Sequence, residues 1–236
     1  LNYFLKAADL LRRTRIYNPR QLESFGLASK AKIYHDIEQF DYLVLKGIDQ
    51  EKFKSLSLLY RKVLSEIHWP SETEIIQIDE KYKNLLKDSY NLIIHQTEAS
   101  KLKVEAVNNS LNVKKITDQY FNHDYGLTYI DNFLSKPALR LLRKFLLEST
   151  IWFDIKKSGY LGAYINEGIA SPLIFQIADE LKNKFPEIFR NHPINQIWAY
   201  KYDSRSRNEN ASIKGINVHA DFAAVNVNFW ITPSEA

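Results

Sequence analysis

Residues 215–233 read GINVHADFAAVNVNFWITP, and this stretch decides how the rest of the chain is interpreted. His219 and Asp221 stand two positions apart at the end of a predicted strand, Ile216–His219, so both side chains can turn to the same side. An imidazole nitrogen and a carboxylate oxygen in this arrangement can bind one metal ion. The sequence therefore predicts a metal site with His219 and Asp221 as ligands.

A second strand is predicted directly after this motif, at Ala224–Ile231, and its two faces differ in character. One face is apolar and consists of Val225, Val227, Phe229 and Ile231. The other face carries Asn226, Asn228 and Trp230, together with Ala224. Amides beside an aromatic ring are typical of a ligand pocket. We therefore expect Asn226, Asn228 and Trp230 to border the metal site, and the apolar face to pack against helices.

Upstream of the motif, the run Gln196–Tyr202 is predicted to form a strand with Tyr200 and Tyr202 on one face. Two interpretations stay open for these tyrosines. They could pack within the sheet with their hydroxyls satisfied at its edge, or they could hydrogen-bond a ligand beside the metal.

The pattern from about residue 125 onward mixes strands with helices, which predicts an α+β fold with a mainly antiparallel sheet. The expected elements are a strand at Gly126–Leu134, a helix opened by Ser135 and Pro137, β-like runs at Ile151–Ile155 and Tyr160–Ile165, and a helix from Ser171 to Phe185.

The first half of the chain is predicted to be helical. Apolar residues recur at helical spacing over Ala31–Lys46, and Gly47 ends that helix. Asp49 is expected to cap a second helix that stops before Pro70, and a third helix is expected over Ser71–Gln96. An irregular helical region and a tetratricopeptide-like repeat remain alternatives. We place the boundary near residues 116–125, which gives a helical region at 1–120 and a second domain at 121–236.

Composition excludes several classes of protein. The chain has no cysteine, so a bound metal must have nitrogen and oxygen ligands, and a cytoplasmic location is expected. No apolar run approaches the roughly 18 residues that a membrane span needs. The net charge of +4 comes from Lys and Arg interspersed with acidic and amide residues, so we expect a solvated basic face and no nucleic-acid or membrane partner.

The span from Thr128 onward resembles the 2-oxoglutarate/Fe(II)-dependent oxygenase superfamily, and in particular its prolyl-hydroxylase-like members. The segments that carry the resemblance are Ile130–Ser135 (IDNFLS), Tyr200–Asp203 (YKYD) and Gly215–Pro233. Some members of the superfamily have a helical or tetratricopeptide-type region ahead of the catalytic domain. The resemblance implies a double-stranded β-helix (jelly-roll, cupin-like) domain over 121–236, with Fe(II) and 2-oxoglutarate as cofactors. It also allows ascorbate.

Residue roles follow from this resemblance. His219 and Asp221 match the first two iron ligands of the catalytic centre. Tyr202 matches a tyrosine that binds the 2-oxoglutarate carboxylate, and Tyr200 competes for that role. Asn226, Asn228 and Trp230 would line the pocket. The implied activity is a dioxygenase that hydroxylates a C–H bond, and the substrate class stays open between a protein side chain, a metabolite, a lipid and a sugar.

The chain contains no methionine and stops at Ala236, directly after the last predicted strand, so we expect an inactive fragment truncated within its oxygenase domain. The third ligand, a histidine, and the basic residue for the far carboxylate would follow downstream. One alternative is a non-catalytic helical interaction module joined to a degenerate barrel, in which the helical region binds a protein partner. Another is a cupin-like hydrolase or isomerase that uses a different divalent ion.

Overall fold

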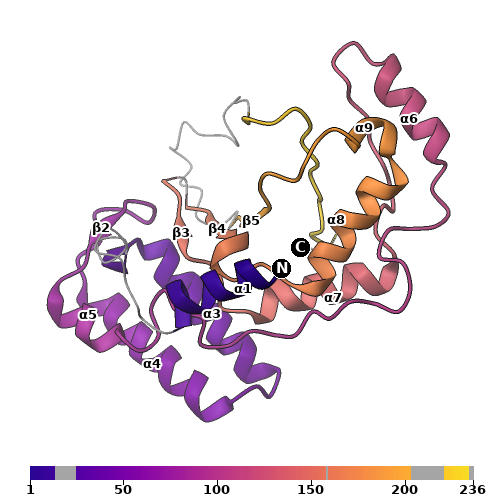
Figure 1. The fold of residues 1–236 in the computed structure, drawn as a ribbon. Coiled ribbons are helices and arrows are strands. Elements are labelled where there is room, and N and C mark those ends of the chain that lie inside the picture. Colours follow the sequence, from indigo (N-terminus) through magenta and orange to yellow (C-terminus); the bar gives the residue numbers. More distant parts are fainter. Residues whose placement is uncertain (14–24, 158, 203–220, 234–236) are drawn as a thin grey trace.

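The computed structural model describes the chain except residues 14–24, 158, 203–220 and 234–236 (Figure 1). The described part is mixed α+β, with 47% helix, 8% strand and two small antiparallel sheets, as the sequence predicted at this level. Helices α3, α4 and α5 lie at one end of the molecule and α6 and α9 at the other, with the larger sheet, α7 and α8 between them. No double-stranded β-helix is formed by the described residues.

Helices α3 (Lys30–Leu45) and α4 (Gln50–Glu66) form the predicted hairpin. Ser29 begins α3 by accepting a hydrogen bond from the Lys32 amide at 3.1 Å, and Gly47 has the left-handed φ of +75° that ends it. Asp49 precedes α4 as expected, but its side chain makes no capping hydrogen bond. The facing stripes are buried and consist of Ile33, Ile37, Phe40, Phe53, Tyr60 and Val63.

The prediction of a single helix over Ser71–Gln96 is wrong. The chain forms strand β2 (Ile76–Gln77), which pairs with β1 (Leu27–Ala28), and then the short helix α5 (Glu80–Leu86). Asn91 has a φ of +54°, which interrupts any further helix. Of the residues at helical spacing in this run, Ile78 and Tyr82 are buried in one cluster with residues of α3 and α4, although Ile78 precedes α5 and only Tyr82 lies within it.

The larger sheet is antiparallel in the order β3 (Asp154–Ile155), β4 (Leu161–Tyr164), β5 (Trp198–Lys201). These strands confirm three of the predicted β-runs. A β-carbon at Gly162 would lie 3.1 Å from an Asp154 carboxylate oxygen, so this position on β4 favours glycine.

Helices α7 (Lys136–Glu148) and α8 (Pro172–Lys184) confirm two further predictions, and each begins at a serine whose hydroxyl accepts from a backbone amide, Ser135 in α7 and Ser171 in α8. Phe145 of α7 and Leu173 of α8 lie in the main core. The remaining elements are α1 (Asn2–Ala8), the π-helix η1 (Asp9–Arg13), α6 (Val113–Asn122), the 3₁₀ helix η2 (Ile165–Glu167) and α9 (Pro186–Phe189).

Two predicted strands are not formed. Within Gly126–Leu134 only Leu134 makes a bridge, to Val107, and Asn132 adopts a φ of +53° that no regular strand allows. Residues 224–231 carry no strand assignment. Alternation of apolar and polar residues does not by itself form a strand, because the backbone of a strand also needs hydrogen-bonding partners. The predicted strand Ile216–His219 lies outside the described residues.

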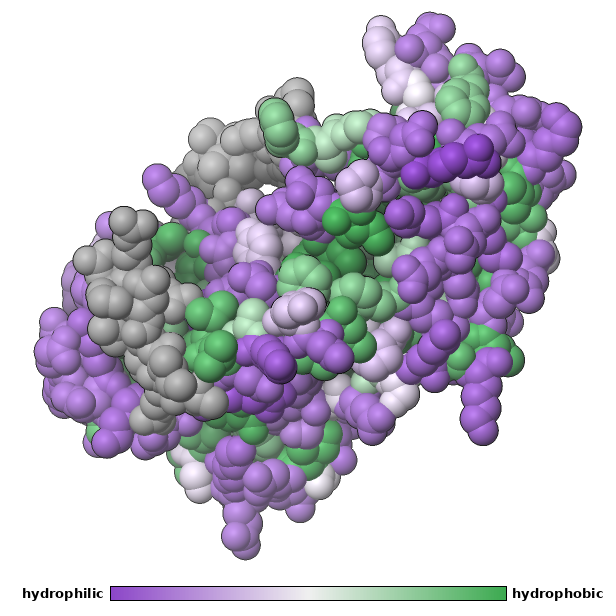
Figure 2. Space-filling view, viewed as in Figure 1, coloured by the Kyte–Doolittle hydropathy of each residue, from purple (hydrophilic) through white to green (hydrophobic). Residues whose placement is uncertain are grey.

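Residues from both sides of the predicted boundary at 116–125 pack together. Ala8 and Ile93 share the main core with Phe145 and Leu173. The Gln39 amide on α3 donates to the carbonyl oxygens of Leu147 and Ser149 at 3.1 and 2.8 Å, which ties α3 to the end of α7. Figure 2 shows apolar side chains gathered in the middle of one face, between the polar surfaces of the two ends. The division into two domains stays a prediction.

Candidate functional site

One of the two expected metal ligands lies in the described part of the chain. Asp221 is described and its side chain is exposed, while its backbone carbonyl accepts from the Ala223 amide at 2.8 Å. His219 falls outside the described residues. The convergence of His219 and Asp221 on one ion therefore stays a prediction.

The donor set of this pair suits iron(II), because imidazole nitrogen and carboxylate oxygen are the ligand types of non-haem iron sites. Asp221 lies at an exposed position. Within the described ranges, no three His, Asp or Glu side chains come together to hold a metal. The chemistry of the two predicted ligands thus fits Fe(II), and they would have to be joined by a further donor.

Tyr200 and Tyr202 lie at the end of β5 and are partly exposed, at 39% and 47%. Both contact Tyr160: the ring centroids of Tyr160 and Tyr202 stack at 4.6 Å, and Tyr200 meets Tyr160 edge-on at 5.3 Å. Burial raises the pKa of Tyr202, and the neighbouring phenols act in the same direction. The Tyr202 hydroxyl therefore keeps its proton at neutral pH and can donate a hydrogen bond to an anion.

Asn226, Asn228 and Trp230 are exposed in the structure, Trp230 to 88%. Partial burial in this segment falls instead on Val225, which packs beside α6 and α9, and on Ile231, which packs against the main core. The role of Asn226, Asn228 and Trp230 as pocket lining stays a prediction, since residues 203–220, which precede them in the sequence, are outside the described part.

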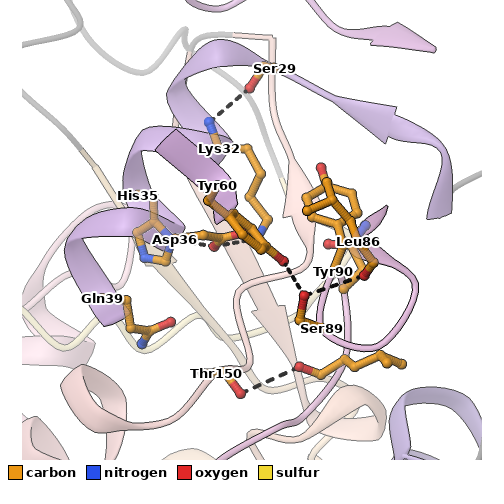
Figure 3. Close-up of polar contacts among 12 residues, drawn as sticks. Ser29, Lys32, His35, Asp36, Gln39, Tyr60, Leu86, Ser89, Tyr90 and Thr150 are labelled. Carbon is orange, nitrogen blue, oxygen red and sulfur yellow. Dashed lines mark hydrogen bonds and ion pairs between the residues drawn. The ribbon is translucent and has the colours of Figure 1, made fainter. Parts of the chain in front are cut away.

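A buried polar cluster that sequence reasoning missed is centred on Lys32, His35 and Asp36 of α3 (Figure 3), and Lys201 joins it to β5. Lys32 Nζ lies 2.5 and 2.6 Å from the two carboxylate oxygens of Asp36, and both side chains are less than 10% exposed. His35 Nδ1 lies 3.0 Å from Asp36 Oδ1, and Lys201 Nζ lies 2.9 Å from His35 Nε2. Asp36 thus favours the tautomer with hydrogen on Nδ1, which leaves Nε2 to accept from Lys201.

The electrostatics of the cluster follow from its burial. Burial, together with the nearby Lys201 ammonium, lowers the pKa of His35 to about 3, so the imidazole is neutral. Burial also lowers the pKa of Lys201 to about 8. Burial alone would raise the pKa of Asp36, but Lys32 and His35 beside it lower it. The cluster therefore holds one carboxylate, a neutral histidine and two lysines.

Aromatic side chains surround the same cluster. Lys32 Nζ lies 5.3 Å from the centre of the Tyr90 ring, and the hydroxyls of Tyr60 and Ser89 are 3.0 Å apart. Burial raises the pKa of Tyr60 and Tyr90 well above the ordinary value. In sequence, Lys32 and Asp36 have the i, i+4 spacing of an ordinary surface ion pair, so nothing local indicated their burial.

A cavity of about 340 Å³ lies beside this region, between η1, β1 and the sheet strands β3 and β4. Arg12 Nη2 pairs with Glu167 at 2.5 Å on its wall, and the Tyr164 hydroxyl donates to Asp154 at 2.8 Å. Its lining consists of Arg12, Leu27, Ile75, Asn91, Phe153, Asp154, Ile155, Tyr164 and Glu167. None of the predicted site residues that the structure describes lines this cavity.

We expect the folded protein to lose stability as pH falls below about 6.5, because His35 is neutral in the fold. An unfolded histidine titrates near 6.5, whereas folded His35 titrates at about 3. Between these values the unfolded chain binds the extra proton, so the contribution is complete above pH 6.5 and declines below it. The slope from this residue is at most about 1.4 kcal/mol per pH unit.

Urea unfolding from pH 7 to pH 5 measures this slope. His35→Gln should reduce the slope by the contribution of one titrating group. Some slope should persist because burial also lowers the pKa of His95. His192→Gln, at an exposed position, is the matched control. An equal slope in His35→Gln and the unmodified protein would contradict the expectation.

No protein-family model, curated protein or solved structure matches this chain. None of the helices in the described part of the chain has both the length and the apolar character needed to cross a membrane.

Proposed function

We propose that the chain provides His219 and Asp221 to the iron(II) centre of a 2-oxoglutarate-dependent dioxygenase that hydroxylates a substrate C–H bond. The observation that carries the proposal is the His219-x-Asp221 motif, which follows the strands of an antiparallel sheet, β3–β4–β5, in the sequence. Tyr200 lies in the last of these strands and Tyr202 directly after it. This sheet would form part of a double-stranded β-helix, the architecture that the resemblance implies.

Each named residue has a role under this proposal. His219 and Asp221 would hold the metal, and the protonated phenol of Tyr202, or of Tyr200, would donate a hydrogen bond to a carboxylate of 2-oxoglutarate. Asn226, Asn228 and Trp230 would border the substrate. The bound iron supplies the activation of dioxygen, while the protein residues fix the positions of the reactants.

The overall reaction balances as 2-oxoglutarate, dioxygen and a C–H substrate giving succinate, carbon dioxide and the hydroxylated product. The test uses protein expressed from its complete reading frame, supplied with Fe(II), air and 2-oxoglutarate. We expect slow formation of succinate even without the true substrate, and its loss when a chelator removes the metal. Succinate is quantified by mass spectrometry.

The outcomes separate the alternatives. Absence of succinate, despite folded protein and bound Fe(II), would contradict the dioxygenase and favour the helical interaction module. Turnover of another substrate without 2-oxoglutarate would favour a cupin-like hydrolase or isomerase.

A further inference from the structure

Strand β5 presents different side chains to its two sides. Tyr200 and Tyr202 lie on one face beside Tyr160, whereas Lys201 between them points toward α3. In the described part of the sheet, β5 hydrogen-bonds only to β4, where Leu161 is paired with Lys201. The position of this strand therefore depends on β4, on the packing of Ile197 and Ala199 against the main core, and on the contacts that hold Lys201.

Lys201 is held by two groups that are themselves fixed. Its Nζ donates to His35 Nε2 at 2.9 Å, and His35 is oriented by Asp36 at 3.0 Å. The same Nζ lies 5.4 Å from the centre of the Trp152 ring, whose Nε1 donates to the Leu146 carbonyl at 3.1 Å. The Lys201 ammonium group thus contacts both helix α3, through His35, and the segment after α7, through Trp152.

The docking of α3 does not itself require Lys201. Gln39 makes two hydrogen bonds to carbonyl oxygens after α7, and α3 packs along α4 through a buried apolar stripe. Removal of the Lys201 head group should therefore leave the helices in place and release mainly the end of β5.

We propose that Lys201 is a positioning residue that fixes the end of β5, and with it Tyr200 and Tyr202, against His35 on α3. The inference rests on the proposed function in one respect, which is that these tyrosines bind 2-oxoglutarate. Through His35, helix α3 fixes the position of the strand beside which the cosubstrate-binding phenols lie. Lys201 touches no reactant in this arrangement and acts only through its neighbours.

The test compares Lys201→Met, which keeps the aliphatic stem, with Lys201→Arg, which keeps a cationic donor. In succinate assays with the complete protein, we expect Lys201→Met to raise KM for 2-oxoglutarate about tenfold with a smaller change in kcat, because small misplacements of binding groups weaken binding markedly. Lys201→Arg should recover much of the loss. Lys114→Met, at an exposed lysine on α6, is the matched control.

A second readout needs no turnover. Hydrogen–deuterium exchange of Lys201→Met should become about tenfold faster over residues 198–202 while α3 and α7 keep their protection. His35→Gln should have the same local effect, and the double variant should add little to either single change, because both act through one contact.

Each result has a defined meaning. Unchanged KM together with unchanged exchange in β5 would overturn the inference, and so would faster exchange throughout the protein with a lowered unfolding midpoint, since that is a general structural effect. If the unmodified protein forms no succinate, the proposed function fails. In that case, faster exchange confined to residues 198–202 would still support the positioning of β5 by Lys201, and any other exchange pattern would overturn it.

Discussion

Alanine at His219 or at Asp221 is expected to reduce 2-oxoglutarate turnover by more than about 100-fold, since loss of a group that merely orients a metal ligand already costs 10- to 100-fold. Each substitution removes a direct donor to the ion, so Fe(II) affinity should fall together with activity. Succinate formation and Fe(II) binding are measured on the same preparations of the complete protein.

The fold should survive the Asp221 substitution because that side chain is exposed. His192→Ala and Asp131→Ala, at exposed positions elsewhere in the chain, are the matched controls and should retain turnover. Succinate formation that is indifferent to both His219→Ala and Asp221→Ala would remove these residues from the metal site, even if the protein proved to be a dioxygenase.

Leucine at Asp36 is expected to destabilise the fold by about 3–5 kcal/mol, because it leaves the Lys32 ammonium buried without its counter-ion. The two side chains are 3% and 8% exposed, so water cannot replace the lost carboxylate without opening the core. His35 would also lose the acceptor for its Nδ1 hydrogen. The free energy of unfolding is measured by urea titration at pH 7.

The double variant Lys32→Met/Asp36→Leu provides the sharpest control. Replacing a buried ion pair by apolar side chains of similar size is often neutral or stabilising, so the double variant should recover most of the lost stability. Asp118→Leu breaks an exposed pair with Lys114 and should leave the unfolding midpoint nearly unchanged. A single Asp36→Leu variant as stable as the unmodified protein would show that the pair is solvated.

Helices whose signals are local were predicted well from the sequence. Ser135 and Ser171 cap α7 and α8, and the apolar spacing within α3 and α4 matches their buried faces. The failures involve partners distant in sequence. The run that became β2 is a strand only because it pairs with β1, almost fifty residues earlier, and residues 224–231 show the alternation of a strand without strand pairing.

The same distinction applies to the sites. Asp221, Tyr200 and Tyr202 could be singled out from spacing and alternation alone, although their roles remain predictions. The cluster around Asp36 could not, because its burial depends on contacts such as that between His35 and Lys201, which are 166 positions apart. A short-range pattern of Lys and Asp looks the same on a solvated helix and in a core.

The ion pair between Arg12 and Glu167 has a consequence for the order in which the protein can acquire its structure during synthesis. The two residues are 155 positions apart, and Ala8 is likewise buried among residues of α7 and α8. At roughly 5–20 residues per second, a ribosome needs on the order of 8–30 s to deliver Glu167 after Arg12. The α3–α4 hairpin can assemble within that interval from neighbouring sequence. The first helix cannot reach its final environment, so its apolar side chains stay available to chaperones until the second half of the chain has emerged.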